Sequence, residues 1–226
     1  MVCAVTRHPS EPWAGGYYGQ SRPELVALLP RPLGRVLDVG CGEGRVAAGL
    51  RAAGASWITG VEIHAPSAER AARSLDEVFV GRLEEHIGGF DGVFDTILLY
   101  DVLEHLPDPA SALVALRGVA APGARVHVSL PNARHWSLVR DLALRGTFGY
   151  TDAGHRDRTH LRWFTRRDIV SLLEQCGWHV ERVDHLPLRR VSALASRLTS
   201  GLTAEFLVYQ WFLLARSRES APEGAR

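Results

Sequence analysis

The 226-residue sequence predicts an α/β fold, with a doubly wound sheet and helices on both of its faces. Short apolar runs with β-branched residues alternate with helical patterns, as in parallel sheets whose strands are buried on both sides. The first run, Val36–Val39, leads into a turn with glycine at every second position, and helix-forming residues follow. A helix that opens at such a turn presents N–H groups to an anionic ligand group.

Composition limits the function without naming it. The length suits one domain with a sizeable core. A net charge of +1 gives no support for a nucleic-acid or anionic-membrane partner. The 3 cysteines lack metal-ligand spacing and favour a reducing compartment. The longest apolar stretch, Phe206–Ala215, contains Tyr209 and Gln210 and is too short to span a bilayer. We expect a cytoplasmic monomer or homodimer with no membrane partner.

The first apolar run contains a carboxylate and excludes one kind of cofactor site. Asp38 is costly inside a buried strand unless something pairs with it. A dinucleotide motif, G-x-G-x-x-G, requires glycine at position 45, where this chain has Arg45. From the residues alone, a generic strand–turn–helix remains open.

The stretch V-L-D-V-G-C-G-E-G closely resembles motif I of class I S-adenosylmethionine-dependent methyltransferases. The resemblance implies a seven-stranded Rossmann-like sheet with an antiparallel last strand. It also implies that the acidic residue and the glycine turn hold the methionine end of the cofactor, through Asp38, Gly40, Cys41 and Gly42. In many such enzymes a leading segment covers the cofactor. Tyr17 and Tyr18, before an expected short helix at Arg22–Leu29, are therefore lid candidates, although they are equally compatible with a cover over the sheet edge.

The second and third expected strands carry the nucleoside end of the cofactor. Trp57–Ile63 ends near Glu62, whose carboxylate can accept hydrogen bonds from both ribose hydroxyls. The alternative is a solvated carboxylate at a strand end. Ile63 is assigned to the cofactor with it. After Val78–Val80, the family often has an acidic residue for the adenine amino group, but this chain has Arg82. Adenine contact is therefore assigned to Leu83 or Glu84.

The fourth strand, Phe94–Tyr100, carries a second resemblance. The sequence D-V-L-E-H-L-P-D-P follows it directly, and similar sequences are common in the family at this place. Because ligands of open α/β sheets bind beyond the carboxyl ends of strands, Tyr100 and Asp101 are expected to flank the sulfonium and the transferable methyl group. Glu104 and His105 lie close by in sequence, with a plain helix-start role as the alternative for His105.

A long segment, Ala133–Thr165, follows an expected helix at Ala110–Ala120, a Pro122-Gly123 turn and a strand at Ala124–Leu130. We expect a helix at Trp136–Arg145 followed by a polar stretch. Long loops inserted in compact domains usually have a function. Its motif, Y-T-D-x-G-H-x-D-R-T-H-L-R-W-F-T, is similar to one in methyltransferases of glycan and natural-product pathways, where it builds the substrate-facing wall. A solvated basic loop is the alternative. The resulting acceptor-binding candidates are His135, Tyr150, His155, Arg158 and Arg162.

The rest of the chain completes the sheet. We expect a helix at Arg166–Gln175 ended by Gly177, a strand at Trp178–Asp184, a helix at Val191–Leu202 and the last strand at Phe206–Ala215. The whole chain, 1–226, is thus one domain. It divides into a tail (1–16), a leading helix or lid (17–33), a cofactor-binding half (34–130), a substrate-facing insertion (131–165), a sheet-completing part (166–216) and a second tail (217–226).

The expected reaction is O-methylation of a small-molecule acceptor with S-adenosyl-L-methionine, which leaves S-adenosyl-L-homocysteine. The acceptor hydroxyl belongs to a sugar, a glycoside or another natural-product-type metabolite. A neutral hydroxyl benefits from a base, worth about 10²–10⁴ in rate, and histidine suits that role near neutral pH. We assign the base to His160, oriented by Asp157, with His105 as the next choice. Arg158 and Arg162 either hold an anionic part of the acceptor or pair with Asp152 and Asp157.

Three alternatives remain open, of which the first is transfer to a nitrogen acceptor, which needs less assistance from a base. Asp101, Glu104, His105 and a distant His160 resemble the E-x-x-E-H…H arrangement of small-RNA 3′-terminal 2′-O-methyltransferases, in which a divalent ion grips the ribose hydroxyls. The ubiquinone-pathway O-methyltransferases carry a similar E-H pair, so a catechol-like diol is also possible. Aspartate in place of the first glutamate weighs against a metal, which we do not favour. The departure at Arg82 leaves room for a cofactor-binding scaffold without catalysis.

Overall fold

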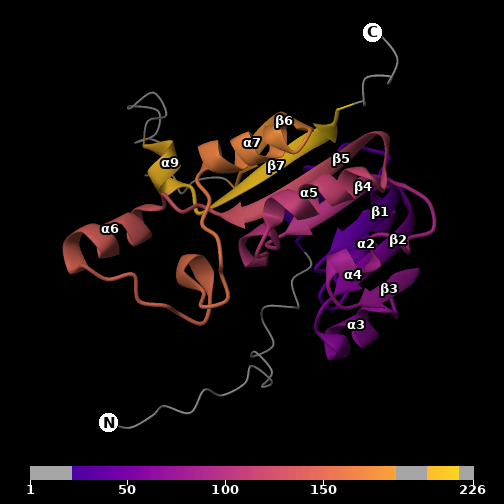
Figure 1. The fold of residues 1–226 in the computed structure, drawn as a ribbon, viewed down its shortest axis with the longest axis horizontal. Coiled ribbons are helices and arrows are strands. Elements are labelled where there is room, and N and C mark those ends of the chain that lie inside the picture. Colours follow the sequence, from indigo (N-terminus) through magenta and orange to yellow (C-terminus); the bar gives the residue numbers. More distant parts are fainter. Residues whose placement is uncertain (1–21, 187–202, 219–226) are drawn as a thin grey trace.

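The computed structural model describes residues 22–186 and 203–218, which form one seven-stranded sheet (Figure 1). The strand order is β3-β2-β1-β4-β5-β7-β6. Strand β7 is antiparallel to both of its neighbours, and the other strands run parallel to one another. The predicted doubly wound sheet with an antiparallel last strand is therefore confirmed. The strands are β1 (Gly34–Val39), β2 (Ala55–Glu62), β3 (Glu77–Val80), β4 (Phe94–Tyr100), β5 (Ala120–Pro131), β6 (Trp178–His185) and β7 (Gln210–Ser217).

Alternate residues of the central strands feed two separate hydrophobic cores. Leu37 and Ile97 belong to one core, and their chain neighbours Val36 and Leu98 belong to the other. Because successive side chains of a strand point to opposite faces, the two cores lie on opposite sides of the sheet. One core includes residues of α1 (Pro23–Val26), α2 (Ala47–Ala52) and α3 (Ala65–Ala71); the other includes residues of α4 (Leu83–His86), α5 (Pro109–Arg117) and α7 (Arg166–Gln175).

Several boundaries differ from the expected ones. The leading helix is shorter, and Arg22 precedes it with a φ of 43°. Helix α5 ends at Arg117 and β5 begins at Ala120, so the dipeptide Pro122-Gly123 lies inside a strand and not between elements. The pairing of β4 with β5 shifts register there, which lets the strand accommodate a proline without a ladder hydrogen bond.

The last strand begins later than predicted. The apolar run from Phe206 continues α9 (Ala204–Leu207), and the strand starts only at Gln210. The side-chain amide of Asn132 explains this break, because its nitrogen donates to the backbone carbonyls of Glu205 and Val208, at 2.6 and 2.8 Å. The expected helix at 191–202 and the two lid candidates Tyr17 and Tyr18 lie outside the described residues.

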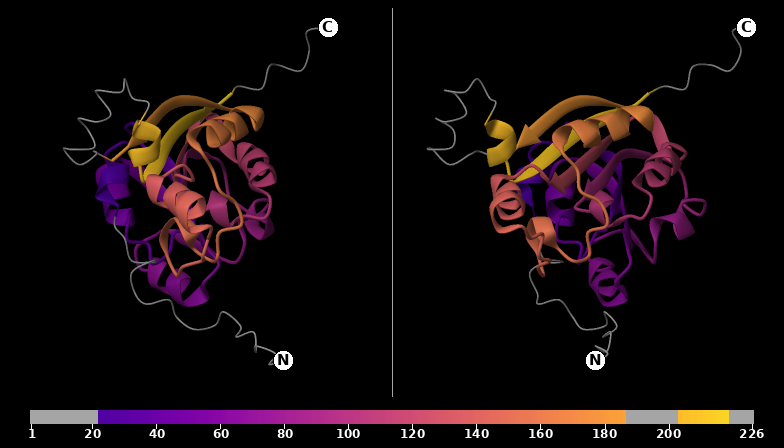
Figure 2. Two further views of the ribbon diagram at one scale, coloured as in Figure 1. Left: turned by 90° about the vertical axis from the view of Figure 1, so that its left-hand side faces the viewer. Right: turned by 60° about the vertical axis from the view of Figure 1, so that its left-hand side comes forward.

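The predicted insertion lies beyond the carboxyl end of β5, where α6 (Trp136–Arg145) is followed by a loop with the short η2 helix (Gly154–Arg156). Both views of Figure 2 keep this loop next to α6. The bounds of α6, α7 and β4 are those expected from sequence. Among the described helices, none combines the length and the hydropathy needed to cross a bilayer.

Candidate active site

The turn after β1 is held in one shape by its glycines and by β2. Gly40 and Gly42 have φ values of 70° and 55°, which glycine adopts at little cost. A Cβ atom on Gly40 would lie 2.9 Å from Cγ2 of Val102, so a side chain does not fit there. The backbone N–H groups of Gly40 and Cys41 both donate to the carbonyl of Val61, at 2.8 and 3.2 Å.

Glu62, at the end of β2, is bound to the same turn. Its side chain is only 3% exposed. Oε2 accepts a hydrogen bond from the Gly42 N–H at 2.9 Å, and Oε1 accepts one from the His64 N–H at 2.8 Å. Since each carboxylate oxygen has two lone pairs, both oxygens keep acceptor capacity for a ligand at this edge of the sheet.

Asp38, in β1, is a buried carboxylate with an unsatisfied atom. Its Oδ2 has no hydrogen-bond partner among the described residues. Burial, followed by the nearby charge of Glu62, raises the pKa of Asp38 to about 7. A cationic group from a ligand would satisfy this oxygen and stabilise the charged form. The neighbouring Cys41 thiol is buried, which raises its pKa well above the usual range.

The remaining cofactor candidates differ in exposure. Ile63 is 62% exposed, a large apolar side chain placed just after the Glu62 carboxylate. Leu83 is buried and Glu84 is exposed. Arg82 is the N-cap of α4, and its backbone N–H donates to Oε2 of Glu85 at 3.2 Å. The departure from the family pattern therefore falls at a helix start.

Asp101 is the centre of a polar network at the end of β4. Its backbone φ is 56°, and its carboxylate accepts from Ser129 Oγ at 3.1 Å, from the Gln210 amide and from Arg22. Three partners thus restrain this side chain. Sequence reasoning missed all three, and the only available signal was the polar Gln210 inside an apolar run.

Tyr100, the residue before this network, contacts a second missed side chain. Its hydroxyl lies 2.9 Å from Nδ1 of His127, which is fully buried in β5. Burial, and then the charge of Arg182, lowers the pKa of His127 to about 3. The imidazole is therefore neutral, and the hydrogen bond between the two groups uses a hydrogen of either the tyrosine hydroxyl or Nδ1.

Glu104, in the short helix η1 (Leu103–His105), lies at the centre of a second cluster. It is 2% exposed, and neither carboxylate oxygen has a hydrogen-bond partner among the described residues. Burial, followed by the charge of Asp101, raises the pKa of Glu104 well above its usual range. The backbone carbonyl of Glu104 accepts from the N–H groups of Leu161 and Arg162, at 2.8 and 3.0 Å, and this pairing brings His160 to the cluster.

Three side chains of this cluster come close together. One potential ligand atom from each of Glu104, His105 and His160 lies within 4.8 Å of the other two. The two imidazole rings make an edge contact with their centroids 4.8 Å apart. Burial, and then His105, lowers the pKa of His160. Sequence analysis named these residues, and the structure brings them together.

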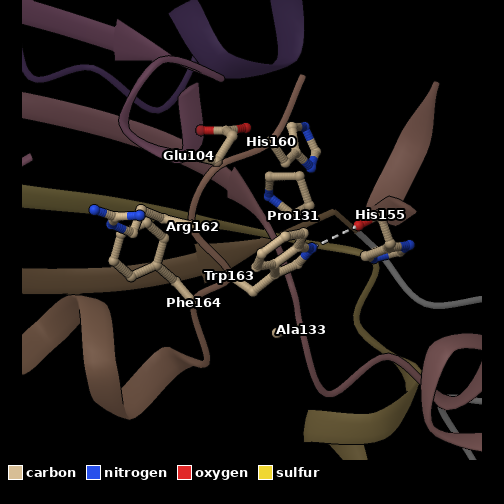
Figure 3. Close-up of a pocket in the computed structure, with 8 residues that line it drawn as sticks. All are labelled: Glu104, Pro131, Ala133, His155, His160, Arg162, Trp163 and Phe164. Atoms are coloured by element: carbon tan, nitrogen blue, oxygen red, sulfur yellow. Dashed lines mark hydrogen bonds between the residues drawn. The ribbon is translucent and has the colours of Figure 1, made fainter. Parts of the chain in front are cut away.

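A pocket lies beside this cluster (Figure 3). The indole Nε1 of Trp163 donates to the backbone carbonyl of His155 at 3.2 Å, which fixes one wall. Two of the sequence-predicted acceptor residues, His155 and Arg162, line it. The complete lining is Glu104, Pro131, Ala133, His155, His160, Arg162, Trp163 and Phe164.

The other acceptor candidates are distributed unevenly. His135 stacks on His155 with centroids 4.8 Å apart, and burial followed by His155 lowers the pKa of His135 to about 4. Tyr150 is 59% exposed and packs on Phe148. Arg158 is paired with the exposed Asp152 at 2.5 Å.

Asp157 is buried, and both hydrogen bonds of its Oδ1 go to Thr159. The backbone N–H of Thr159 donates to it at 2.8 Å and the Thr159 hydroxyl at 2.7 Å. That hydroxyl also lies 3.1 Å from Nδ1 of His105. The carboxylate thus connects through Thr159 to His105. Sequence analysis did not identify Thr159.

Comparisons with known proteins place the chain in a family. A family model described as a methyltransferase domain matches residues 14–183. A ubiquinone biosynthesis O-methyltransferase of Sodalis glossinidius is 35% identical over 162 residues, which cover 68% of this chain and 59% of that protein. One from Aeromonas salmonicida is 33% identical over 183 residues, 76% of each chain. The chain therefore belongs to the methyltransferase-domain family.

Solved structures share the fold. A SAM-dependent methyltransferase from Archaeoglobus fulgidus has a TM-score of 0.64 at 15% identity, and the match covers 83% of this chain and 87% of that one. Magnesium protoporphyrin IX methyltransferase from Synechocystis, solved with SAH, has a TM-score of 0.58 at 19% identity, with 88% and 84% covered. The resemblance to class I S-adenosylmethionine-dependent methyltransferases is thus confirmed, and S-adenosylmethionine is the methyl donor of that class. The matches cover 44–59% of the length of four of the curated relatives.

Proposed function

We propose that this chain is an S-adenosylmethionine-dependent O-methyltransferase that acts on a hydroxyl of a small-molecule acceptor. The observation that carries the proposal is the cluster of Glu104, His105 and His160 after β4, adjacent to the strand ends that carry Asp38 and Glu62. A proton-accepting cluster beside a cofactor edge is what transfer to a hydroxyl requires.

The residues of the cofactor edge fit the chemical groups of S-adenosylmethionine. Asp38 Oδ2, which is buried without a partner in the described part of the chain, suits the cationic amine of the methionine end. The remaining lone pairs of Glu62 suit the ribose hydroxyls. We assign adenine to the segment at Leu83 and Glu84, and the sulfonium to the neighbourhood of Tyr100 and Asp101. When bound, the cofactor supplies an electrophilic methyl group.

The histidines supply the base in this proposal. Burial keeps His160 neutral near pH 7, so the imidazole holds a lone pair for the acceptor proton. His105 lies against it and shares the role. The pocket is too small to enclose an acceptor, but its wall of Trp163, Phe164 and Arg162 offers aromatic faces and a cation. We infer that a ring that carries hydroxyl groups, such as a sugar, a glycoside or another natural-product-type metabolite, would lie against this wall.

A metal-assisted reaction on a diol is the second candidate. Glu104 has two buried oxygens without partners in the described part of the chain, and a carboxylate with two imidazoles is a ligand set for a divalent ion. Glu104, His105 and His160 would hold the ion, which would lower the pKa of an acceptor hydroxyl. The ubiquinone-biosynthesis names of the relatives favour a catechol-like acceptor for this candidate.

One experiment separates these candidates. The purified protein is incubated with labelled S-adenosylmethionine and a panel of nucleotide sugars, glycosides and catechols, with and without chelator. Turnover that survives chelation removes the metal-assisted candidate. Cofactor binding without turnover on any acceptor supports the scaffold alternative, and a protein that binds no cofactor contradicts the proposal. The cytoplasmic location and the division of the chain into functional parts stay predictions.

A further inference from the structure

We propose that Thr159 and Asp157 are positioning residues that fix the tautomer of His105, with the proton on Nδ1 and the lone pair on Nε2. The catalytic consequence of this inference rests on the proposed function. The tautomer itself rests on four contacts between residues 105, 157 and 159.

The first contact is between Nδ1 of His105 and the backbone carbonyl of Thr159, 3.2 Å apart. A carbonyl oxygen can only accept a hydrogen bond. The imidazole nitrogen must therefore be the donor, which requires a proton on Nδ1.

The second contact gives the same answer independently. The Thr159 hydroxyl has one hydrogen, and this hydrogen is directed to the Asp157 carboxylate at 2.7 Å. Only a lone pair of the hydroxyl oxygen then faces Nδ1 of His105, at 3.1 Å. Nδ1 thus meets two acceptors, and both are satisfied by its proton.

Asp157 makes the arrangement rigid. It is 2% exposed, and its Oδ1 also accepts the backbone N–H of Thr159 at 2.8 Å. The N–H of His160 donates to the Asp157 carbonyl at 3.1 Å, which closes the turn. The four residues 157–160 therefore supply both His160 and the group that orients His105.

For the chemistry, the consequence is a hydrogen-bond chain in which His105 donates to the Thr159 hydroxyl and that hydroxyl donates to the Asp157 carboxylate. With the proton on Nδ1, the lone pair of Nε2 is the one that can take a proton or bind a divalent ion. The ring lies against His160, in the cluster with Glu104. The same tautomer serves both candidate mechanisms, and it makes His105 the histidine with the defined orientation.

The direct test is the ¹⁵N NMR spectrum of the histidine side chains in the full-length protein at pH 8, with His105 assigned by its loss in His105→Gln. We expect the Nδ1–H tautomer in the wild type and in Thr159→Ser, which keeps the hydroxyl. Thr159→Val removes the hydroxyl at constant shape and leaves the backbone carbonyl of residue 159 as the one remaining acceptor at Nδ1. We therefore expect part of the population to shift from the Nδ1–H to the Nε2–H tautomer. Thr147→Val, an exposed threonine of the same insertion, is the matched control and should leave the spectrum unchanged.

Kinetics give the second readout on the acceptor found in the screen. Thr159→Val should lower kcat by about 10–100-fold, with cofactor affinity unchanged, and Thr159→Ser should recover most of it. An Nε2–H tautomer in the wild type, or a Thr159→Val variant with wild-type tautomer and kcat, would overturn the inference. Because the NMR measurement needs no acceptor, failure of the methyltransferase proposal leaves this test able to decide.

Discussion

The cofactor edge and the acceptor cluster are built in different ways. At the cofactor edge, Asp38 and Glu62 belong to neighbouring strands, and the Glu62 carboxylate holds the glycine turn through the backbone N–H of Gly42. In the acceptor cluster, Glu104 and His160 are 56 positions apart (160 − 104) in the chain, and a loop brings them together. The first region depends on strand spacing, whereas the second depends on tertiary contacts.

This difference teaches which property each region controls. Changes at the cofactor edge are expected to alter cofactor affinity and stability, since Glu62 binds backbone N–H groups and Asp38 is a buried carboxylate. Changes in the acceptor cluster (Glu104, His105 and His160) are expected to alter turnover, since these groups can accept a proton, lie close together and border a pocket through Glu104 and His160. Four predictions test the separation.

The largest effect is expected in the acceptor cluster. His105→Gln and His160→Gln should each lower kcat by about 10²–10⁴, the usual contribution of a base, with cofactor affinity unchanged by calorimetry. His179→Gln, on the exposed face of β6, is the control and should leave both quantities unchanged. A loss of cofactor affinity equal to the loss of kcat would break the proposed separation.

The second effect is a pH dependence at the cofactor edge. Because the pKa of Asp38 is about 7 in the folded protein and near 3.8 in the unfolded chain, the native state holds an extra proton between these values. The free energy of unfolding of the cofactor-free protein therefore falls as pH rises from about 4 to 7. Asp38→Asn cannot ionise and should gain stability relative to wild type between pH 5 and pH 8, by about 3 kcal/mol.

Denaturant unfolding at the two pH values measures this change. Asp91→Asn, which alters an exposed aspartate, is the control. Parallel stability of wild type and Asp38→Asn at both pH values would show that Asp38 ionises normally in the folded state.

A smaller effect is expected for Glu62→Gln. The glutamine side chain has one oxygen that can accept a hydrogen bond, and its NH₂ group can only donate. Because Glu62 accepts from the N–H groups of both Gly42 and His64, one of these two hydrogen bonds is lost in the variant. Cofactor affinity should fall by about 10–100-fold, and stability by about 1–3 kcal/mol. Thermal unfolding and calorimetry check both, with Glu69→Gln on the exposed face of α3 for comparison. Unchanged cofactor affinity would remove Glu62 from the ribose assignment.

The smallest effect is expected at Arg158. Its ion pair with Asp152 is exposed, with 58% and 78% of the two side chains accessible, and such pairs contribute little. Arg158→Ala should change stability by less than about 0.5 kcal/mol. An increase in the acceptor KM, with kcat and cofactor affinity unchanged, would assign Arg158 to the acceptor and settle the choice left open by the sequence.

The elements with strong local signals could be predicted from sequence. Buried runs such as Phe94–Tyr100 and the capped helix Arg166–Gln175 have the bounds that their patterns predict, because side-chain periodicity and capping are local properties. The glycine turn with its two carboxylates was found for the same reason. The parts of the site that lie on these elements were therefore predictable.

Contacts between distant segments could not be predicted. The break before β7 depends on the Asn132 amide, which lies more than 70 positions away from its acceptors. The partners of Asp101 come from three separate segments of the chain, and the role of Thr159 depends on a histidine 54 positions earlier. The residues around each of these side chains give no signal of its distant partner, so local sequence patterns cannot predict the pairing.

The main-chain pairing between the Glu104 carbonyl and residues 161 and 162 has an evolutionary consequence. Because these hydrogen bonds join backbone atoms of η1 and of the insertion, they survive the exchange of side chains around the pocket. A chimera that takes residues 146–163 from a relative with another acceptor should then keep the donor site and inherit the new acceptor preference. The donor site and the acceptor-binding insertion would then be exchangeable parts that are joined by backbone hydrogen bonds.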